Sequence, residues 1–207
     1  MNKKAVIIIV IIVVVVGKIL LDRGSRISIA NVPEPVQTPA TGHKKTEVKG
    51  YDVNIQYLYE YDMKALVVST KNYGGSSVGD ALSPKDLAVA WGTVAANNGE
   101  VDFHWTQSGR WVSWRLKSYD ELANIGTEAD VNRQSANCHI IPADSEVRGK
   151  LNKIKRGKYI HLKGYLVNIN GVNKKGDTFY WNSSTTREDT GAHSCEVIYT
   201  TDIEILN

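Results

Sequence analysis

An uninterrupted apolar run opens the chain and constrains it more than any later segment does. Residues 5–16 read AVIIIVIIVVVV, and after Gly17 and Lys18 the run continues to Leu21. As a helix, residues 5–21 would be about 25 Å long, which is the short end of what spans a bilayer. In lipid a helix is the single-segment structure that satisfies its own backbone hydrogen bonds. We therefore predict a transmembrane helix within residues 1–23.

The flanks of this run indicate that it stays attached to the protein. Residues 1–4 (MNKK) are the basic start of a signal peptide or signal anchor, and no small-x-small cleavage site directly follows the run. Basic residues stand on both sides, so the positive-inside rule barely discriminates between orientations. The short basic start favours a single-pass signal anchor with an extracytoplasmic globular domain.

The rest of the chain divides into a linker and a folded part. Residues 24–49 contain Pro33, Pro35 and Pro39 among polar residues without apolar periodicity, and predict a flexible tether. Residues 50–207 are enough for one globular domain with a hydrophobic core, and a sub-boundary is placed near residues 118–137.

Charge limits the partners of that domain. Four of the 25 basic residues and one of the 22 acidic residues lie in residues 1–23, which leaves 21 of each for the remainder. A formally neutral domain gives no support for nucleic-acid binding, which is driven by neutralisation of phosphates.

Alternation of apolar and polar residues predicts strands in the front half. Residues 51–61 carry an apolar or aromatic residue at every odd position, and residues 64–73 are their expected hairpin partner. Ser83, Pro84 and Asp86 resemble a helix start, so we expect a helix from there to about residue 96.

The back half predicts further strands and two short helices. We expect strands at residues 101–105, 110–116, 158–169, 178–181 and 195–200, and helices near residues 127–136 and 144–154. Gly164 within a strand indicates a bulge or a sharp bend. The fold class is α+β, with mainly antiparallel strands, a partly closed (OB-like) barrel and two or three short helices.

One polar and aromatic loop is a candidate binding site. Between two predicted strands, Trp181, Ser183, Arg187 and Asp189 would line a groove. The alternative is structural, with an Arg187–Asp189 pair and hydroxyl groups that stabilise a long turn. Residues 189–191 (DTG) also match the aspartic-protease triplet, but they lack the second carboxylate of that dyad.

The two cysteines are open to several interpretations. Cys138 lies beside His139, and Cys195 lies two residues after His193. Outside the cytoplasm a Cys138–Cys195 disulfide is expected; in the cytosol, buried free thiols are. A zinc site is disfavoured by the spacing. A catalytic thiol is a further alternative, because sortases place a His and a Cys at a similar separation, although their TLxTC context is missing here.

A dense basic cluster is the last candidate. It would bind an anionic polymer, or else form a solvated face, as lysines on a short helix commonly do. Its members are Arg148, Lys150, Lys153, Lys155, Arg156, Lys158 and Lys163.

Four segments together resemble a group of bacterial single-pass membrane-anchored proteins of unknown function with a C-terminal OB-like β-barrel segment. The resemblance implies a layout and assigns no catalytic residue. The segments are residues 82–92 (LSPKDLAVAWG), 137–143 (NCHIIPA), 157–167 and 181–196.

These features predict a membrane-tethered envelope module that binds a protein or polymer partner, with no cofactor and no metal. The first alternative is a membrane-anchored enzyme that uses His139, His193, Cys195 or Asp189. The second is a cytosol-facing adaptor that uses the basic cluster around Lys155 and Arg156.

Overall fold

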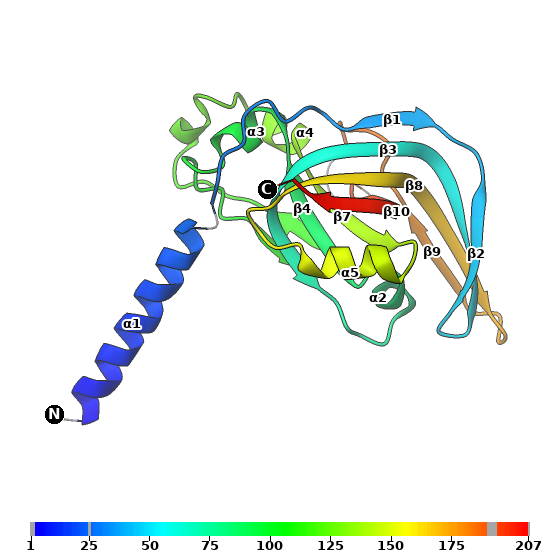
Figure 1. Ribbon diagram of the computed structural model, residues 1–207, viewed down its shortest axis with the longest axis horizontal. Helices are drawn as coiled ribbons and strands as arrows, with labels where there is room; N and C mark the ends of the chain where they lie inside the picture. Colours follow the sequence, from blue (N-terminus) through cyan, green and yellow to red (C-terminus); the bar gives the residue numbers. More distant parts are fainter. Residues whose placement is uncertain (1–2, 25, 190–193, 207) are drawn as a thin grey trace.

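The computed structural model describes residues 3–24, 26–189 and 194–206, in which an N-terminal helix precedes a strongly curved sheet (Figure 1). Helix α1 (Lys3–Gly24) projects away from the sheet. The side chains of residues 6–14 on α1 are 38–64% exposed. Over the described residues, none of the helices combines the length and the apolar character that crossing a bilayer requires. The predicted transmembrane helix is therefore not found among them.

Five strands form a closed ring of pairings. Each pairing is antiparallel except that of β7 with β10, which is parallel. In ring order, with the last strand pairing again with the first, they are β3 (Tyr51–Asn72), β4 (Lys85–Ala90), β7 (Ser135–Pro142), β10 (Glu196–Ile205) and β8 (Tyr159–Asn173). The predicted α+β class, with mainly antiparallel strands and a sheet that partly closes on itself, is confirmed.

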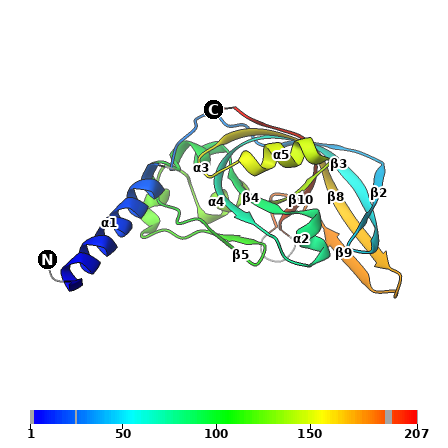
Figure 2. The same cartoon turned by 60° about the horizontal axis from the view of Figure 1, so that its bottom comes forward.

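Smaller elements surround this ring. Strands β1 (Val36–Pro39) and β2 (His43–Val48) pair along β3, and β9 (Thr178–Asn182) pairs along β8. The short helices are α2 (Val78–Leu82), α3 (Gly92–Asn97), the 3-10 helix η1 (Tyr119–Leu122), α4 (Glu128–Arg133) and α5 (Ser145–Lys153). Strands β5 (Thr106–Ser108) and β6 (Trp111–Ser113) form a separate two-stranded sheet. In Figure 2, α5 lies along the upper side of the barrel, while β5 and α2 lie at its lower side.

Two helices begin where their capping residues predict. Asp144 accepts a hydrogen bond from the backbone of Val147 and caps α5, which buries Val147 and Leu151 against the barrel. Thr127 and Asp130 form a reciprocal capping box at the start of α4. Both helices are shorter than the ranges that the sequence predicts.

The predicted hairpin between residues 51–61 and 64–73 is wrong. Residues 51–72 form one strand, β3, which pairs with β8 along most of its length. The residues between the two predicted strands, Asp62 and Met63, supply no turn-forming Gly, Pro or Asn. The strand bends instead at an irregularity between Tyr57 and Tyr59, where one residue is left over in the register with β8.

Gly164, where a bulge or a sharp bend is expected, permits a close approach inside the barrel. It pairs with both β3 and β10, and a Cβ atom built on it would collide with the backbone carbonyl oxygen of Tyr199. The register shift of β10 between Thr200 and Asp202 lies directly beside it. A side chain at this position is therefore incompatible with the observed curvature.

The helix predicted from Ser83 to residue 96 is wrong over most of its length. Residues 85–90 form β4, and every one of them is buried, because this strand lies between β3 and β7. The Lys85 ammonium donates to the carbonyl oxygens of Leu151 and Ile154 at the end of α5, 3.3 and 2.5 Å away. The Leu151 carbonyl also accepts from the backbone NH of Ile154, so the buried lysine adds a second bond there and satisfies the carbonyl of Ile154, the C-cap residue of the helix.

The segment predicted as a flexible tether is largely folded. Besides β1 and β2, it contains Ile27, Ile29 and Val32, which pack against the main core. The backbone NH of Ile29 donates to the carbonyl of Ala95 in α3. Its polar strands lack apolar periodicity because they lie at the sheet's edge, where β3 supplies the pairing.

Residues 91–134 form an insertion between β4 and β7 that contributes to the main core. Its large side chains Trp91, Phe103 and Trp105 are buried together with residues of the barrel. Trp105 donates through Nε1 to Asn98. Residues 101–105, predicted as a strand, are not one, and only the short β5 and β6 pair within this insertion.

Candidate functional site

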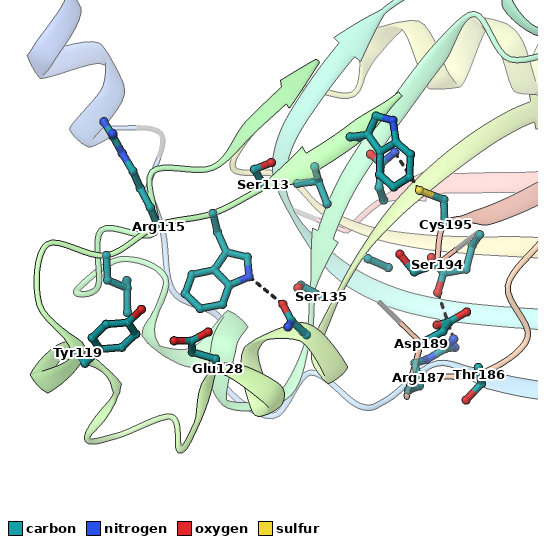
Figure 3. Close-up of a pocket in the computed structure, with 18 of the residues that line it drawn as sticks. Ser113, Arg115, Tyr119, Glu128, Ser135, Thr186, Arg187, Asp189, Ser194 and Cys195 are labelled. Carbon is teal, nitrogen blue, oxygen red and sulfur yellow. Dashed lines mark hydrogen bonds and ion pairs between the residues drawn. The ribbon is translucent and has the colours of Figure 1, made fainter. Parts of the chain in front are cut away.

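A cavity of about 540 Å³ separates the insertion from the end of the barrel where β7 and β10 begin (Figure 3). One wall comes from β6 and the residues that follow it, together with α4. The other comes from the start of β7, the loop after β9 and the start of β10. Its described lining residues are Trp111 to Tyr119, Glu128, Asn132, Ser135, Ala136, Asn137, Thr186, Arg187, Asp189, Ser194, Cys195 and Glu196.

The insertion wall presents aromatic rings. Trp111 and Tyr119 are 45% and 69% exposed, which is high for such large apolar surfaces. Trp114 is partly buried, and its Nε1 donates to Asn132 of α4 at 2.9 Å, which fixes the orientation of the ring. Tyr119 is hydrogen-bonded to Glu128, and this bond raises the pKa of its hydroxyl. The rings of Trp114 and Tyr119 are thus held by polar contacts, and the wall leaves aromatic surface uncovered.

The barrel wall contains a buried ion pair. Arg187 Nη1 lies 3.1 Å from Oε1 of Glu196, and its Nη2 donates to the hydroxyl of Tyr61 at 2.9 Å. Glu196 is 2% exposed, and its second oxygen, Oε2, has no hydrogen-bond partner. Burial raises the pKa of the Glu196 carboxyl from 4.5 to about 7, although Arg187 opposes this shift. The carboxyl group therefore changes charge near neutral pH.

Both cysteines are free thiols, so the structure contains no Cys138–Cys195 disulfide. Glu196, and not Cys195, is the partner of Cys138 in the β7–β10 register. The Cys195 sulfur accepts a hydrogen bond from the Asn137 amide at 3.7 Å and donates one to the backbone carbonyl of Arg110 at 3.8 Å. Burial raises the pKa of Cys195 to about 11 and that of Cys138 well above its usual value. Neither thiol is therefore a ready nucleophile.

A partly buried arginine fixes the β5–β6 hairpin against the barrel. Arg110 makes ion pairs with Asp86 of β4 at 2.7 Å and with Asp80 of α2 at 2.6 Å. Its Nη2 also donates to the carbonyl of Ser83 at 2.9 Å. The guanidinium carbon lies 3.6 Å from the centroid of the Tyr73 ring, a cation–π distance. We call Arg110, Asp80, Asp86, Ser83 and Tyr73 the arginine clamp.

The backbone at the hairpin tip completes this attachment. Gly109 and Arg110 both have positive φ values, 58° and 73°, as a tight hairpin turn requires. The amide of Arg110 donates to the Tyr73 hydroxyl, and its carbonyl accepts from Asn137. Asn137 also accepts from Gln107. Because Trp111 directly follows Arg110, the arginine clamp determines the position of the insertion wall, which carries the aromatic rings and is called the aromatic wall below.

The residues predicted as a groove divide between two places. Arg187 and Asp189 line the cavity. Ser183 instead accepts a hydrogen bond from the backbone of Val197 and donates to the carbonyl of Ser184, which is a structural role. Trp181 lies beside His139, with ring centroids 4.7 Å apart, and outside the cavity lining.

The histidines do not assemble a catalytic site with a cysteine in the described structure. His139 is buried, and its Nδ1 lies 3.0 Å from Oδ2 of Asp86 without the alignment of a hydrogen bond. His193 and residues 190–191 of the DTG triplet lie outside the described residues. Across residues 3–24, 26–189 and 194–206, no three His, Cys, Asp or Glu side chains are grouped as metal ligands.

The basic cluster lies on and after α5, away from the cavity. Lys155 is exposed and Arg156 is partly buried. Lys150 pairs with Asp202 at 2.8 Å and with Glu146 at 3.3 Å. This partial neutralisation agrees with a solvated helix face.

Several site residues were not predicted from the sequence. In the sequence, Trp111 and Trp114 alternate imperfectly on predicted strands, which core or edge packing explains without a ligand. Arg110 and Glu196 are not among the predicted site residues. Glu196 had a usable signal, because it is an acidic residue that opens the apolar strand EVIY. Arg110 had none, since its partners Asp80 and Asp86 lie 24 or more residues away.

Comparison of the chain with protein-family models, with curated proteins and with solved structures found no match. The resemblance to bacterial membrane-anchored proteins therefore stays a prediction.

Proposed function

We propose that this protein is a membrane-attached binding module whose ligand occupies the cavity between the insertion and the barrel. The observation that carries this proposal is the lining of the cavity. Uncovered aromatic rings face a polar wall in a space of about 540 Å³, within the range of about 300–1,000 Å³ typical of ligand pockets.

Attachment to a membrane is supported by the apolar run of residues 5–21 in the sequence. The side chains of residues 6–14 are exposed along α1. Such a row of apolar side chains is costly in water and favourable in lipid. Protease accessibility in intact cells and in spheroplasts tests the orientation, and full protection in spheroplasts would contradict an extracytoplasmic domain.

The order of the strands supports a binding barrel of the OB type. In chain order the five ring strands are β3, β4, β7, β8 and β10, with α5 between the third and the fourth. OB-type barrels are five-stranded Greek-key barrels that bind oligonucleotides or oligosaccharides near their second and third strands. Here the β5–β6 hairpin lies against β4 and β7 through Arg110 and Gln107. Because the hairpin occupies this face of the barrel, we place the ligand in the cavity beside the hairpin.

Binding is favoured over catalysis by the state of the candidate nucleophile. Cys195 lines the cavity, but burial raises its pKa to about 11, and its described hydrogen bonds go to an amide and a carbonyl. An activated nucleophile needs an adjacent base or a lowered pKa. The His139 ring lies against Asp86 and Trp181, and it is not an adjacent base for Cys195 in the described hydrogen bonds.

Site-specific photo-crosslinking in cells tests the proposal. A benzoylphenylalanine in place of Trp111 should form an adduct, whereas the same residue in place of Tyr180 should not. Tyr180 is 70% exposed and lies on β9, outside the cavity lining. A second substitution that fills the cavity, Thr186→Trp, should abolish the adduct at position 111. Equal adducts at both positions, or none at either, would contradict a ligand in the cavity.

A further inference from the structure

We infer that the cavity takes a short segment of a neutral oligosaccharide. This inference rests on the proposed function, because it names the chemical class of the ligand that the cavity would bind. Three properties of the lining carry it, namely the exposed rings, the balance of charge and the excess of hydroxyl and amide groups.

The exposed rings suit the apolar face of a sugar. A pyranose presents C–H groups on one face, and these pack on the electron-rich face of an aromatic ring. Trp111 and Tyr119 offer such faces, and Trp114 is held rigidly by Asn132. A rigid ring loses little conformational entropy when a ligand stacks on it.

The charges around the cavity cancel. Above the pKa of the Glu196 carboxyl, Arg187 and Glu196 neutralise each other at 3.1 Å within the barrel wall. The remaining charges among the described lining residues are two basic residues, Arg115 and Lys117, and two acidic residues, Glu128 and Asp189. A site for a phosphate, a nucleic acid or a polycation needs an excess of one sign, since complementary potential drives such recognition.

The polar groups suit hydroxyls, which both donate and accept hydrogen bonds. Hydroxyl and amide side chains supply both functions around the cavity. They are Ser113, Ser118, Ser135, Thr186, Ser194 and Asn132.

A peptide ligand is less well matched. Extended peptides commonly add to an unpaired strand edge, and apolar pockets receive their side chains. Strand β6 in this wall is only three residues long, and within the described part of the lining the aliphatic residues are Val112, Leu116 and Ala136. The cavity therefore offers little for backbone pairing or for aliphatic anchors.

The test is a titration of the full-length chain in lauryldimethylamine oxide micelles, whose headgroup contains no sugar. The probes are maltotetraose, cellotetraose and N,N′,N″,N‴-tetraacetylchitotetraose, with tetragalacturonate as the charged counterpart. We expect at least one neutral probe to quench or shift tryptophan fluorescence with a Kd between about 10 μM and 1 mM. Trp111→Ala should weaken that binding at least about tenfold. The matched control Tyr180→Ala should leave it unchanged.

Two kinds of result would overturn the inference. No binding of any neutral probe, or equal binding by the Trp111→Ala variant, would exclude the sugar assignment. Preferential binding of tetragalacturonate would replace it with an anionic ligand. The crosslinking experiment at position 111 separates this failure from failure of the proposed function. A peptide adduct at position 111 would support the binding module but exclude a sugar ligand. Absence of any adduct would exclude both proposals.

Discussion

The barrel and the β5–β6 hairpin are held in place by different kinds of interaction. In the barrel, β3 pairs with β8 from Tyr51 to Leu66 through backbone hydrogen bonds, and four further pairings complete the ring. The hairpin forms a sheet of its own, and Arg110 ties it to β4 and α2 through side-chain contacts. Backbone pairing distributes stability over many residues, whereas the hairpin is held by a few side-chain contacts that centre on the partly buried Arg110 and on Asn137.

This difference has a consequence for the cavity, because one wall belongs to each region. The barrel wall is fixed by the start of β10 and carries Glu196. The aromatic wall is fixed indirectly, through the residue that precedes Trp111. Substitutions that test the two regions should therefore differ in size and in what they disturb.

The largest effect is expected from Arg110→Ala. The change leaves Asp86, whose side chain is 0% exposed, without its ion pair, and breaking a buried pair costs about 3–5 kcal/mol. We expect this loss in the free energy of unfolding measured by urea denaturation. We also expect greater access of acrylamide to Trp111, because the hairpin is released.

Two controls isolate the cause of that effect. Arg115→Ala, at an exposed position of the same segment, should change stability by less than about 0.5 kcal/mol. Adding Asp86→Asn to Arg110→Ala should recover part of the loss, because a buried amide costs less than a buried charge. A double variant as unstable as the single one would show that unpaired Asp86 is not the cause.

Gly164→Ala tests the barrel. The new Cβ would collide with the carbonyl oxygen of Tyr199, which belongs to the paired backbone and cannot move aside easily. Overpacking of this kind costs about 1–3 kcal/mol, and we expect the upper end.

The matched control for Gly164→Ala is Gly149→Ala in α5. A Cβ at Gly149 meets no atom within 4 Å, and replacing a helical glycine stabilises by about 0.5–1 kcal/mol. If Gly164→Ala stabilised the protein as Gly149→Ala is expected to do, the close packing of β8 on β10 would be contradicted.

Glu196→Gln tests the buried ion pair through the pH dependence of stability. A carboxyl pKa raised from 4.5 to about 7 means that the folded state binds the proton more tightly than the unfolded state does. Wild-type stability should therefore fall as pH rises from about 5 to 8, by up to about 3 kcal/mol. The Gln variant should lose most of this slope, whereas the exposed Glu188→Gln should keep it. A wild-type stability that rises over this interval would contradict the raised pKa.

The smallest effect concerns the thiols and leaves stability unchanged. With a pKa of about 11, Cys195 should react with iodoacetamide at pH 8 roughly 100-fold more slowly than an ordinary cysteine, because the thiolate is the nucleophile. Buried Cys138 should react only after unfolding. The mass of the urea-unfolded protein without reductant should increase by two adducts, and an unmodified mass would indicate a disulfide.

The sequence predicts local structure best where local contacts decide it. Helices were expected from about Thr127 and Asp144, and these two residues cap α4 and α5. A bulge or a sharp bend was expected at Gly164, and the register shift of β10 lies directly beside it. The prediction was wrong at Ser83, where a helix-start pattern yields to a strand buried between β3 and β7. It was also wrong at residues 36–48, where pairing with the long strand β3 orders a polar segment.

The cavity was harder to predict because its parts come from distant segments. Arg187 and Asp189 were found because they share one loop with aromatic and hydroxyl residues. Trp111 was assigned to packing, since a sequence does not show which side of a short hairpin remains uncovered. The link from Arg110 to Asp80 and Asp86 spans 24–30 residues and depends on the tertiary structure.

The connection between α1 and the rest of the domain is very short in sequence. Only residue 25 separates Gly24, the last residue of α1, from Arg26, which pairs with Asp102 at 3.1 Å. Ser28 then accepts from the amide of Gly99, and Ile27 accepts from Asn98. If α1 lies in a membrane, as proposed, the cavity would stay within about one domain diameter of the lipid surface, because only a single residue separates α1 from the first contacts of the domain. Such a protein depends on its ligand coming within reach, and its range is set by lateral diffusion in the membrane.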